Sequence, residues 1–128
     1  MQKIALEGFR LSPQQKRFWS LQPNSSAYRA QCAILLEGKL QVEILKEAVQ
    51  QVVKRHEILR TKFQLRPGIA IPAQVICDHS NPDWQTFNLS DLTPQQQQAK
   101  IEELFQAERS LTFDWERDSL LRLSLLVL

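Results

Sequence analysis

The residues best suited to chemistry lie between Arg55 and Phe63, where a histidine, a glutamate and an arginine follow closely. His56 stands directly before Glu57, an order that suggests a proton-transferring pair. Neighbouring residues on a helix point in different directions, however, so these two side chains cannot act together as acid and base. His56 also falls on the apolar stripe of the preceding segment. We therefore expect a packed, hydrogen-bonded histidine and not a catalytic one.

Arg60 is the second residue of this segment with chemical potential. It follows a predicted helix and precedes a predicted strand, and we expect the neighbouring Ile58, Leu59 and Phe63 to be buried. A buried arginine needs a carboxylate or several carbonyl groups, because an unpaired buried charge is costly. An exposed arginine would instead cover apolar surface with its aliphatic stem. The residues alone leave both possibilities open.

The rest of the chain suggests no nucleophile, phosphate site or metal site. His79 lies in a polar loop, and nothing in the sequence pairs it with a nucleophile. The three glycines are isolated, which excludes both the nucleophile elbow of serine hydrolases and a glycine-rich phosphate loop. Cys32 and Cys77 are far apart and lack C-x-x-C spacing, which argues against a metal site. A disulfide between them stays open, but we expect two buried free thiols.

The composition is that of a globular domain, or of one lobe of a larger one. The chain has 128 residues, of which 43% are hydrophobic and 23% charged. Sixteen basic and fourteen acidic residues give a net charge of +2, and the basic residues are scattered, which does not favour nucleic acid binding. No apolar run is long enough to span a bilayer, and the N-terminus is a poor secretion signal. We expect a cytoplasmic protein that binds neither nucleic acid nor membranes.

Three helices are predicted from capping signals and apolar spacing. Ser12 and Thr93 each precede a proline and stand three residues before a glutamine, which is the pattern of a capping box at a helix start. Between these two helices, apolar residues recur at spacings of three and four. This spacing predicts a long helix from about residue 41 to about residue 56.

Strands are predicted where apolar residues alternate or run together. The predicted ranges are 28–36, 61–65, 73–77 and 120–128. The order helix, strand, helix, two strands, helix, strand predicts a mixed sheet with packed helices, in the α/β (α+β) class.

The last predicted strand, residues 120–128, is apolar on both faces toward its end. Such a strand belongs inside a sheet that is covered on both sides. An open apolar edge would promote aggregation. We therefore expect residues 120–128 to be a central strand, either of a longer protein from which the chain is cut or of a sheet that a partner completes.

Three segments resemble the condensation domains of nonribosomal peptide synthetases, the units that form peptide bonds. Leu11–Gln22 resembles the first motif of the family, and its matching residues are Gln15, Arg17, Trp19 and Leu21. Residues 40–63 resemble the second motif, RHExLRTxF, and the helix before it. The matching residues are Arg55, His56, Glu57, Leu59, Arg60 and Thr61. Residues 113–126 resemble the segment that precedes the active-site motif, with Ser119 where the family prefers proline.

The resemblance implies a fold of two chloramphenicol-acetyltransferase-like lobes with a tunnel between them. Residues 1–128 would be the N-terminal portion of the first lobe, ending before the HHxxxDG motif that carries the catalytic histidine. No catalytic residue is then expected in this chain. By its position, Arg60 would pair with the aspartate of HHxxxDG and act as structural support of the active site, not as a reacting group.

The resemblance also implies substrates and partners. The parent domain would join an acyl or peptidyl thioester to the amine of an aminoacyl thioester. Each substrate would hang on the phosphopantetheine arm of a donor or an acceptor carrier protein, so the chain would bind no cofactor directly. Its partners would be the rest of the condensation domain and these carrier proteins. Two alternatives stay open: a non-catalytic docking module of a synthetase, and a small acyltransferase assembled from several chains.

Overall fold

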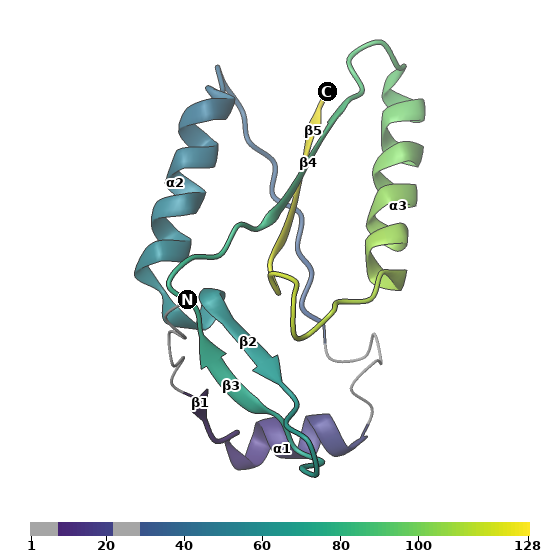
Figure 1. Cartoon of the computed structure of the whole chain (residues 1–128). Helices are drawn as coiled ribbons and strands as arrows, with labels where there is room; N and C mark the ends of the chain where they lie inside the picture. The colour runs from purple at the N-terminus through teal and green to yellow at the C-terminus, as the bar shows by residue number, and fades with distance from the viewer. Residues whose placement is uncertain (1–7, 22–28) are drawn as a thin grey trace.

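The computed structural model describes residues 8–21 and 29–128, and its helices and strands form two small sheets with three main helices around them (Figure 1). In chain order the elements are β1 (Gly8–Phe9), α1 (Pro13–Leu21), α2 (Val42–Arg55), the 3-10 helix η2 (Glu57–Arg60), β2 (Thr61–Gln64), β3 (Ala73–Ile76), β4 (Asp83–Asn88), α3 (Pro94–Ser110) and β5 (Arg122–Val127).

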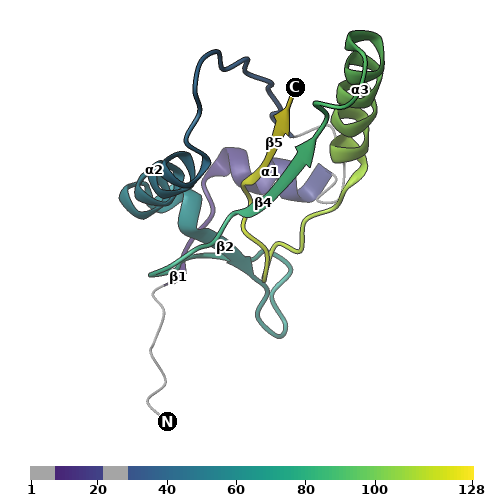
Figure 2. The same cartoon turned by 90° about the horizontal axis from the view of Figure 1, so that it is seen from above.

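The two sheets differ in strand direction. The first is antiparallel with the order β1-β3-β2, and the second is the parallel pair β4-β5. Helices α2 and α3 stand on opposite sides of the β4-β5 pair, and α1 lies beside the first sheet (Figures 1 and 2). This arrangement confirms the predicted mixture of packed helices and sheet.

The predicted helix starts are confirmed. The Ser12 backbone N–H donates to Gln15 Oε1 at 2.8 Å, and the Gln15 N–H donates to Ser12 Oγ at 3.1 Å. Thr93 and Gln96 make the same reciprocal pair at the start of α3. These bonds satisfy amides that have no partner within the helix. Helix α2 also lies within a residue of its predicted bounds, and the predicted β2 and β3 form a hairpin.

The predicted strand at residues 28–36 is wrong for the part that the structure describes. Tyr28 lies outside the described residues, and residues 29–37 form neither a helix nor a strand. Instead, Arg29 Nη1 donates to the carbonyls of Glu108 and Arg109 at 3.4 and 3.3 Å, and Gln31 Nε2 donates to that of Phe105 at 2.9 Å. Alternating apolar residues predict an extended conformation, but a strand also needs a hydrogen-bonding neighbour.

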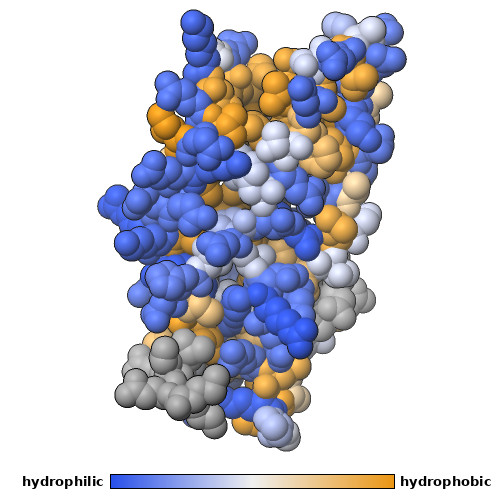
Figure 3. All heavy atoms as spheres, turned by 45° about the horizontal axis from the view of Figure 1, so that its top comes forward, coloured by the Kyte–Doolittle hydropathy of each residue, from blue (hydrophilic) through white to orange (hydrophobic). Residues whose placement is uncertain are grey.

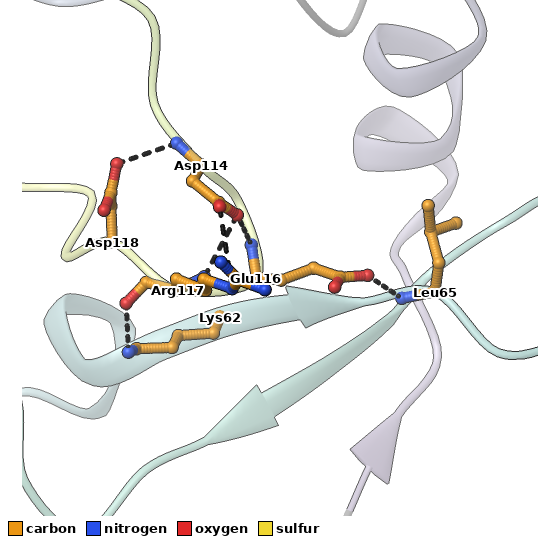
Figure 4. Close-up of polar contacts among 6 residues, drawn as sticks. All are labelled: Lys62, Leu65, Asp114, Glu116, Arg117 and Asp118. Atoms are coloured by element: carbon orange, nitrogen blue, oxygen red, sulfur yellow. Dashed lines mark hydrogen bonds and ion pairs between the residues drawn. The ribbon is translucent and has the colours of Figure 1, made fainter.

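The loop between α3 and β5 covers the outer edge of β2 and so joins the two sheets (Figure 4). The Phe63 N–H donates to the Trp115 carbonyl at 2.9 Å, and the Leu65 N–H donates to Glu116 Oε1 at 3.0 Å. The Trp115 ring also lies edge-on to Phe63 and to Trp19, at centroid distances of 5.7 and 6.0 Å. Trp115 therefore connects this loop to β2 and to α1.

The fully buried apolar core is small for a chain of this size. Its members among the described residues are Leu11, Val53, Val75 and Leu89. Many large apolar side chains of the described residues are instead exposed, and those of Ile34, Leu35 and Ile58 are 76%, 71% and 65% exposed.

Replacing Trp115 should separate the loop from β2. We expect Trp115→Ala to lower the free energy of unfolding by about 2–4 kcal/mol, because two ring contacts and the packing of a half-buried indole are lost. Trp115→Phe should recover part of this loss. Urea denaturation followed by circular dichroism measures both, and an unchanged midpoint for Trp115→Ala would show that the loop does not hold β2.

The capping box of α3 offers a second test. Thr93→Ala removes the acceptor for the Gln96 N–H and should cost about 1 kcal/mol in the same denaturation experiment. Thr112→Ala is the matched control, because Thr112 is exposed and uses only its backbone carbonyl, which accepts from Arg122. Equal effects of the two substitutions would contradict the capping role.

Candidate functional site

Arg60 lies where η2 meets β2, with its side chain turned toward the end of β3. Its Nη1 donates to the Cys77 carbonyl at 2.6 Å, and the Cys77 N–H donates to the Arg60 carbonyl at 2.9 Å. The residue is half-buried, and its Nε is buried without a hydrogen-bond partner. No carboxylate among the described residues forms an ion pair with it. Arg60 is therefore held by one carbonyl and retains an unused donor.

The local sequence explains this position. Helix α2 ends at Arg55, and η2 then adds a short turn before β2 begins. Thr61 is 5% exposed, and its Oγ1 donates to the Glu57 carbonyl at 2.9 Å, which fixes this turn. The antiparallel register pairs Thr61 with Ile76, so Cys77 comes to lie opposite Arg60.

The expected packing of His56 is wrong. His56 is exposed, and its backbone N–H donates to the Val52 carbonyl at 3.0 Å as the C-cap of α2. Its extended backbone (φ −108°, ψ 106°) takes it off the apolar stripe of the helix. Ile58 is 65% exposed and so is not buried either.

The other residues of the second motif do not form a reactive group in the described structure. Arg55 and Glu57 are exposed, and Leu59 is half-buried. No hydrogen bond or ion pair in the described part of the chain joins the side chains of His56 and Glu57.

Gln15 and Trp19 of the first motif attach α1 to its surroundings. Gln15 Nε2 donates to Gln74 Oε1 at 3.3 Å on β3, and Trp19 packs against Trp115. Arg17 and Leu21, by contrast, are exposed. The first motif thus positions a helix against the first sheet.

Sequence reasoning missed Cys77, Gln74 and Trp115 as contact residues. The register of the β2-β3 hairpin would have identified Cys77, but the length of its connecting loop left that register undetermined. No local signal distinguishes Trp115 from other loop residues. The expectation of two buried thiols is also wrong in part, because both cysteines are free but Cys32 is exposed and Cys77 is half-buried.

The described residues offer few other places for chemistry. They contain no cluster of three or more side chains able to hold a metal ion, and none of their helices is long and apolar enough to cross a membrane. A cavity of about 430 Å³ lies at the starts of β4 and β5. Its lining residues are Asn81, Pro82, Asp83, Trp84, Arg117, Asp118, Ser119 and Arg122. Within the second motif, Arg60 is the best-defined hydrogen-bond donor. Its Nε has no partner, so it can donate a hydrogen bond to an acceptor but is not suited to proton transfer.

Curated relatives of this chain are large synthases. The chain is 34% identical over 102 residues to bacitracin synthase 3 of Bacillus licheniformis, a match that covers 80% of this chain and 2% of that protein. It is 29% identical over 120 residues to gramicidin S synthase 2 of Brevibacillus brevis, a match that covers 91% of this chain and 3% of that protein. The chain therefore spans a small part of the length of these relatives.

Solved structures share its fold. The condensation domain of the monacolin K polyketide synthase MokA superposes with a TM-score of 0.72 at 23% identity, over 93% of this chain and 26% of that chain. A four-domain nonribosomal peptide synthetase bound to AMP and glycine gives a TM-score of 0.60 at 19% identity, over 94% of this chain and 9% of that chain. Residues 7–128 also match the family model of the condensation domain. With this match across nearly its whole length, the chain belongs to the condensation domain family.

Proposed function

We propose that residues 1–128 form the N-terminal portion of the first lobe of a condensation domain that makes peptide bonds in a nonribosomal peptide synthetase. The observation that carries this proposal is the family match over residues 7–128. The bond would form between a carrier-bound acyl or peptidyl donor and the amine of a carrier-bound aminoacyl acceptor. The isolated chain would be inactive, because the catalytic histidine of the family lies in the HHxxxDG motif, which this sequence does not contain.

Arg60 would serve as a structural support of the active site. The family resemblance pairs it with the aspartate of HHxxxDG, a motif absent from this sequence. The buried Nε of Arg60, which lacks an acceptor, supports this role. A carboxylate on that atom would satisfy the donor and neutralise a half-buried charge.

The partners follow from the same proposal. Donor and acceptor carrier proteins would present their substrates on phosphopantetheine arms, and the rest of the condensation domain would complete the tunnel. This chain would then position substrates without binding a cofactor itself. The whole assembly would act in the cytoplasm.

A non-catalytic docking module of a synthetase is the second candidate. The large exposed apolar surface favours it, because such surfaces mark contacts with other polypeptides. The third possibility, an acyltransferase assembled from several chains, has less support, because His56 is exposed and no acid–base pair forms at the second motif.

The proposed function predicts that the chain alone transfers nothing. Purified chain would be mixed with a loaded donor carrier and a loaded acceptor carrier, and intact-protein mass spectrometry would follow the acyl group. We expect no transfer, whereas a complete condensation domain of matching specificity should transfer under the same conditions. Transfer by the chain alone would contradict the proposal.

Arg60 can be tested through stability. In a complete condensation domain that contains this chain, Arg60→Ala should lower the free energy of unfolding by about 3–5 kcal/mol, because a buried carboxylate would lose its partner. In the isolated chain the same change removes only the bond to Cys77 and should cost about 1 kcal/mol. Arg55→Ala, at an exposed arginine nearby, serves as the control. Equal effects of Arg60→Ala in the two proteins, measured by urea denaturation, would remove the supporting role.

A further inference from the structure

Thr61 is the only polar residue that is buried among those the structure describes. It is 5% exposed, and it directly follows Arg60 at the first position of β2. Its Oγ1 donates to the Glu57 carbonyl at 2.9 Å. A valine has nearly the same shape and would suit the start of a strand without burying a polar atom. Packing alone therefore does not account for the hydroxyl, whereas its hydrogen bond does.

This hydrogen bond spans the turn that carries Arg60. Helix η2 is a single 3-10 turn of four residues, and the hydroxyl bond joins the residue after this turn to Glu57, its first residue. Hydrogen bonds within a 3-10 turn have poorer geometry than those of an α-helix, so an added side-chain bond matters more there. The Thr61 hydroxyl thus closes the turn.

Arg60 is held on both sides of its backbone. After the residue, the Cys77 N–H donates to the Arg60 carbonyl at 2.9 Å, and before it, the Thr61 bond keeps Glu57 in place. Between these two restraints, Arg60 Nη1 reaches the Cys77 carbonyl. No carboxylate among the described residues forms an ion pair with Arg60. Because a long side chain otherwise samples many rotamers, the fixed backbone is what directs the guanidinium.

We propose that Thr61 is a positioning residue for the transfer reaction of the complete domain. Its hydroxyl fixes η2, and η2 fixes the direction in which Arg60 presents its guanidinium, whose Nε donor has no partner. This inference rests on the proposed function, in which Arg60 supports the active site. Thr61 acts through Arg60 and not on the substrate. A small displacement of a supporting group lowers a rate more than it lowers stability.

The exposed apolar surface explains why the direction of Arg60 must be set within this chain. Apolar side chains gather between the hydrophilic surfaces of the two long helices (Figure 3). Under the proposed function, the rest of the domain packs onto such surface and brings the acceptor for Arg60. Apolar contacts are non-directional, so they do not orient a guanidinium. A turn that is already closed provides this orientation before the rest of the domain packs.

Two substitutions of Thr61 test this role in the complete domain that contains this chain. Thr61→Val removes the hydroxyl and keeps the shape, whereas Thr61→Ser keeps the hydroxyl. Transfer between loaded carriers is measured per folded protein, with the folded fraction taken from circular dichroism. We expect Thr61→Val to lower kcat by about tenfold with an unchanged KM for the acceptor carrier. Thr61→Ser should recover most of the rate.

A hydroxyl that only stabilises the fold predicts a different result. Thr61→Val would then lower the melting temperature but leave kcat of the folded protein unchanged, which would overturn the inference. Equal losses for Thr61→Val and Thr61→Ser would count against it as well, because the hydroxyl would not matter. Thr112→Val is the matched control and should keep the parent rate, since Thr112 is exposed and bonds to Arg122 through its backbone carbonyl.

Combined substitutions test whether Thr61 acts through Arg60. If Thr61 only places Arg60, adding Thr61→Val to Arg60→Ala should lower kcat no further. Where Arg60→Ala prevents folding, Arg60→Lys replaces it, because lysine keeps the charge but lacks the planar guanidinium. Two losses that multiply would mean that Thr61 acts independently of Arg60, and the inference would be wrong.

Hydrogen exchange in this chain alone gives a readout that needs no transfer. The Cys77 N–H bonds to the Arg60 carbonyl at the end of the hairpin, so Thr61→Val should speed its exchange by about tenfold. The Leu89 N–H, which donates to the Val127 carbonyl of β5, should exchange at an unchanged rate. The same Cys77 exchange rate with and without the hydroxyl would overturn the inference.

The outcomes also separate this inference from the proposed function. A parent domain that transfers nothing between loaded carriers would remove the proposed function and the inference with it. A parent domain whose transfer rate is the same with Thr61→Val would remove the inference alone and leave the proposed function in place.

Discussion

Trp115 stands edge-on to an aromatic ring from β2 and to another from α1, while its carbonyl accepts a hydrogen bond from Phe63. A two-stranded sheet such as β4-β5 has little stability of its own, and a short three-stranded one is marginal. The contact therefore gives each sheet a neighbour to pack against. It also restrains β2, the strand that begins directly after Arg60, and so restrains the arginine itself. The placement of the charged side chain depends on an aromatic contact made some fifty residues later in the chain.

Local signals predicted local structure well. The capping boxes at Ser12 and Thr93 and the apolar spacing of α2 depend on residues within a turn or two, and the structure confirms them. His56 was misplaced because α2 ends at Arg55, one residue earlier than the spacing suggested, and the extended backbone of His56 turns its side chain off the apolar stripe of the helix.

Features that depend on distant partners were not predictable in this way. Strand β4 was missed because its large apolar residues, Trp84 and Phe87, are three apart and do not alternate. Residues 29–37 show the opposite error, because their pattern predicts a strand whose partner no described residue supplies. The Arg60–Cys77 bond depends on the register of a hairpin, which composition does not determine. The family resemblance, in contrast, depends on residue order alone, and it located the second motif without any of these contacts.

Two arginines share a feature that links the site to the outer edge of β5, which faces away from β4. Arg60 Nε and Arg122 Nη1 are both buried without a hydrogen-bond partner, and each guanidinium is otherwise held by a backbone carbonyl. An unsatisfied buried donor costs about 1–3 kcal/mol, a large fraction of the stability of a small domain. Arg60 directly precedes β2, and Arg122 is the first residue of β5. Pairing with Cys77 and with Asp83 fixes the two backbones, while each side chain keeps an open donor. Both arginine nitrogens therefore need acceptors, and the outer edge of β5 needs hydrogen-bonding partners. A polypeptide segment that packs onto another brings such polar groups together with apolar surface.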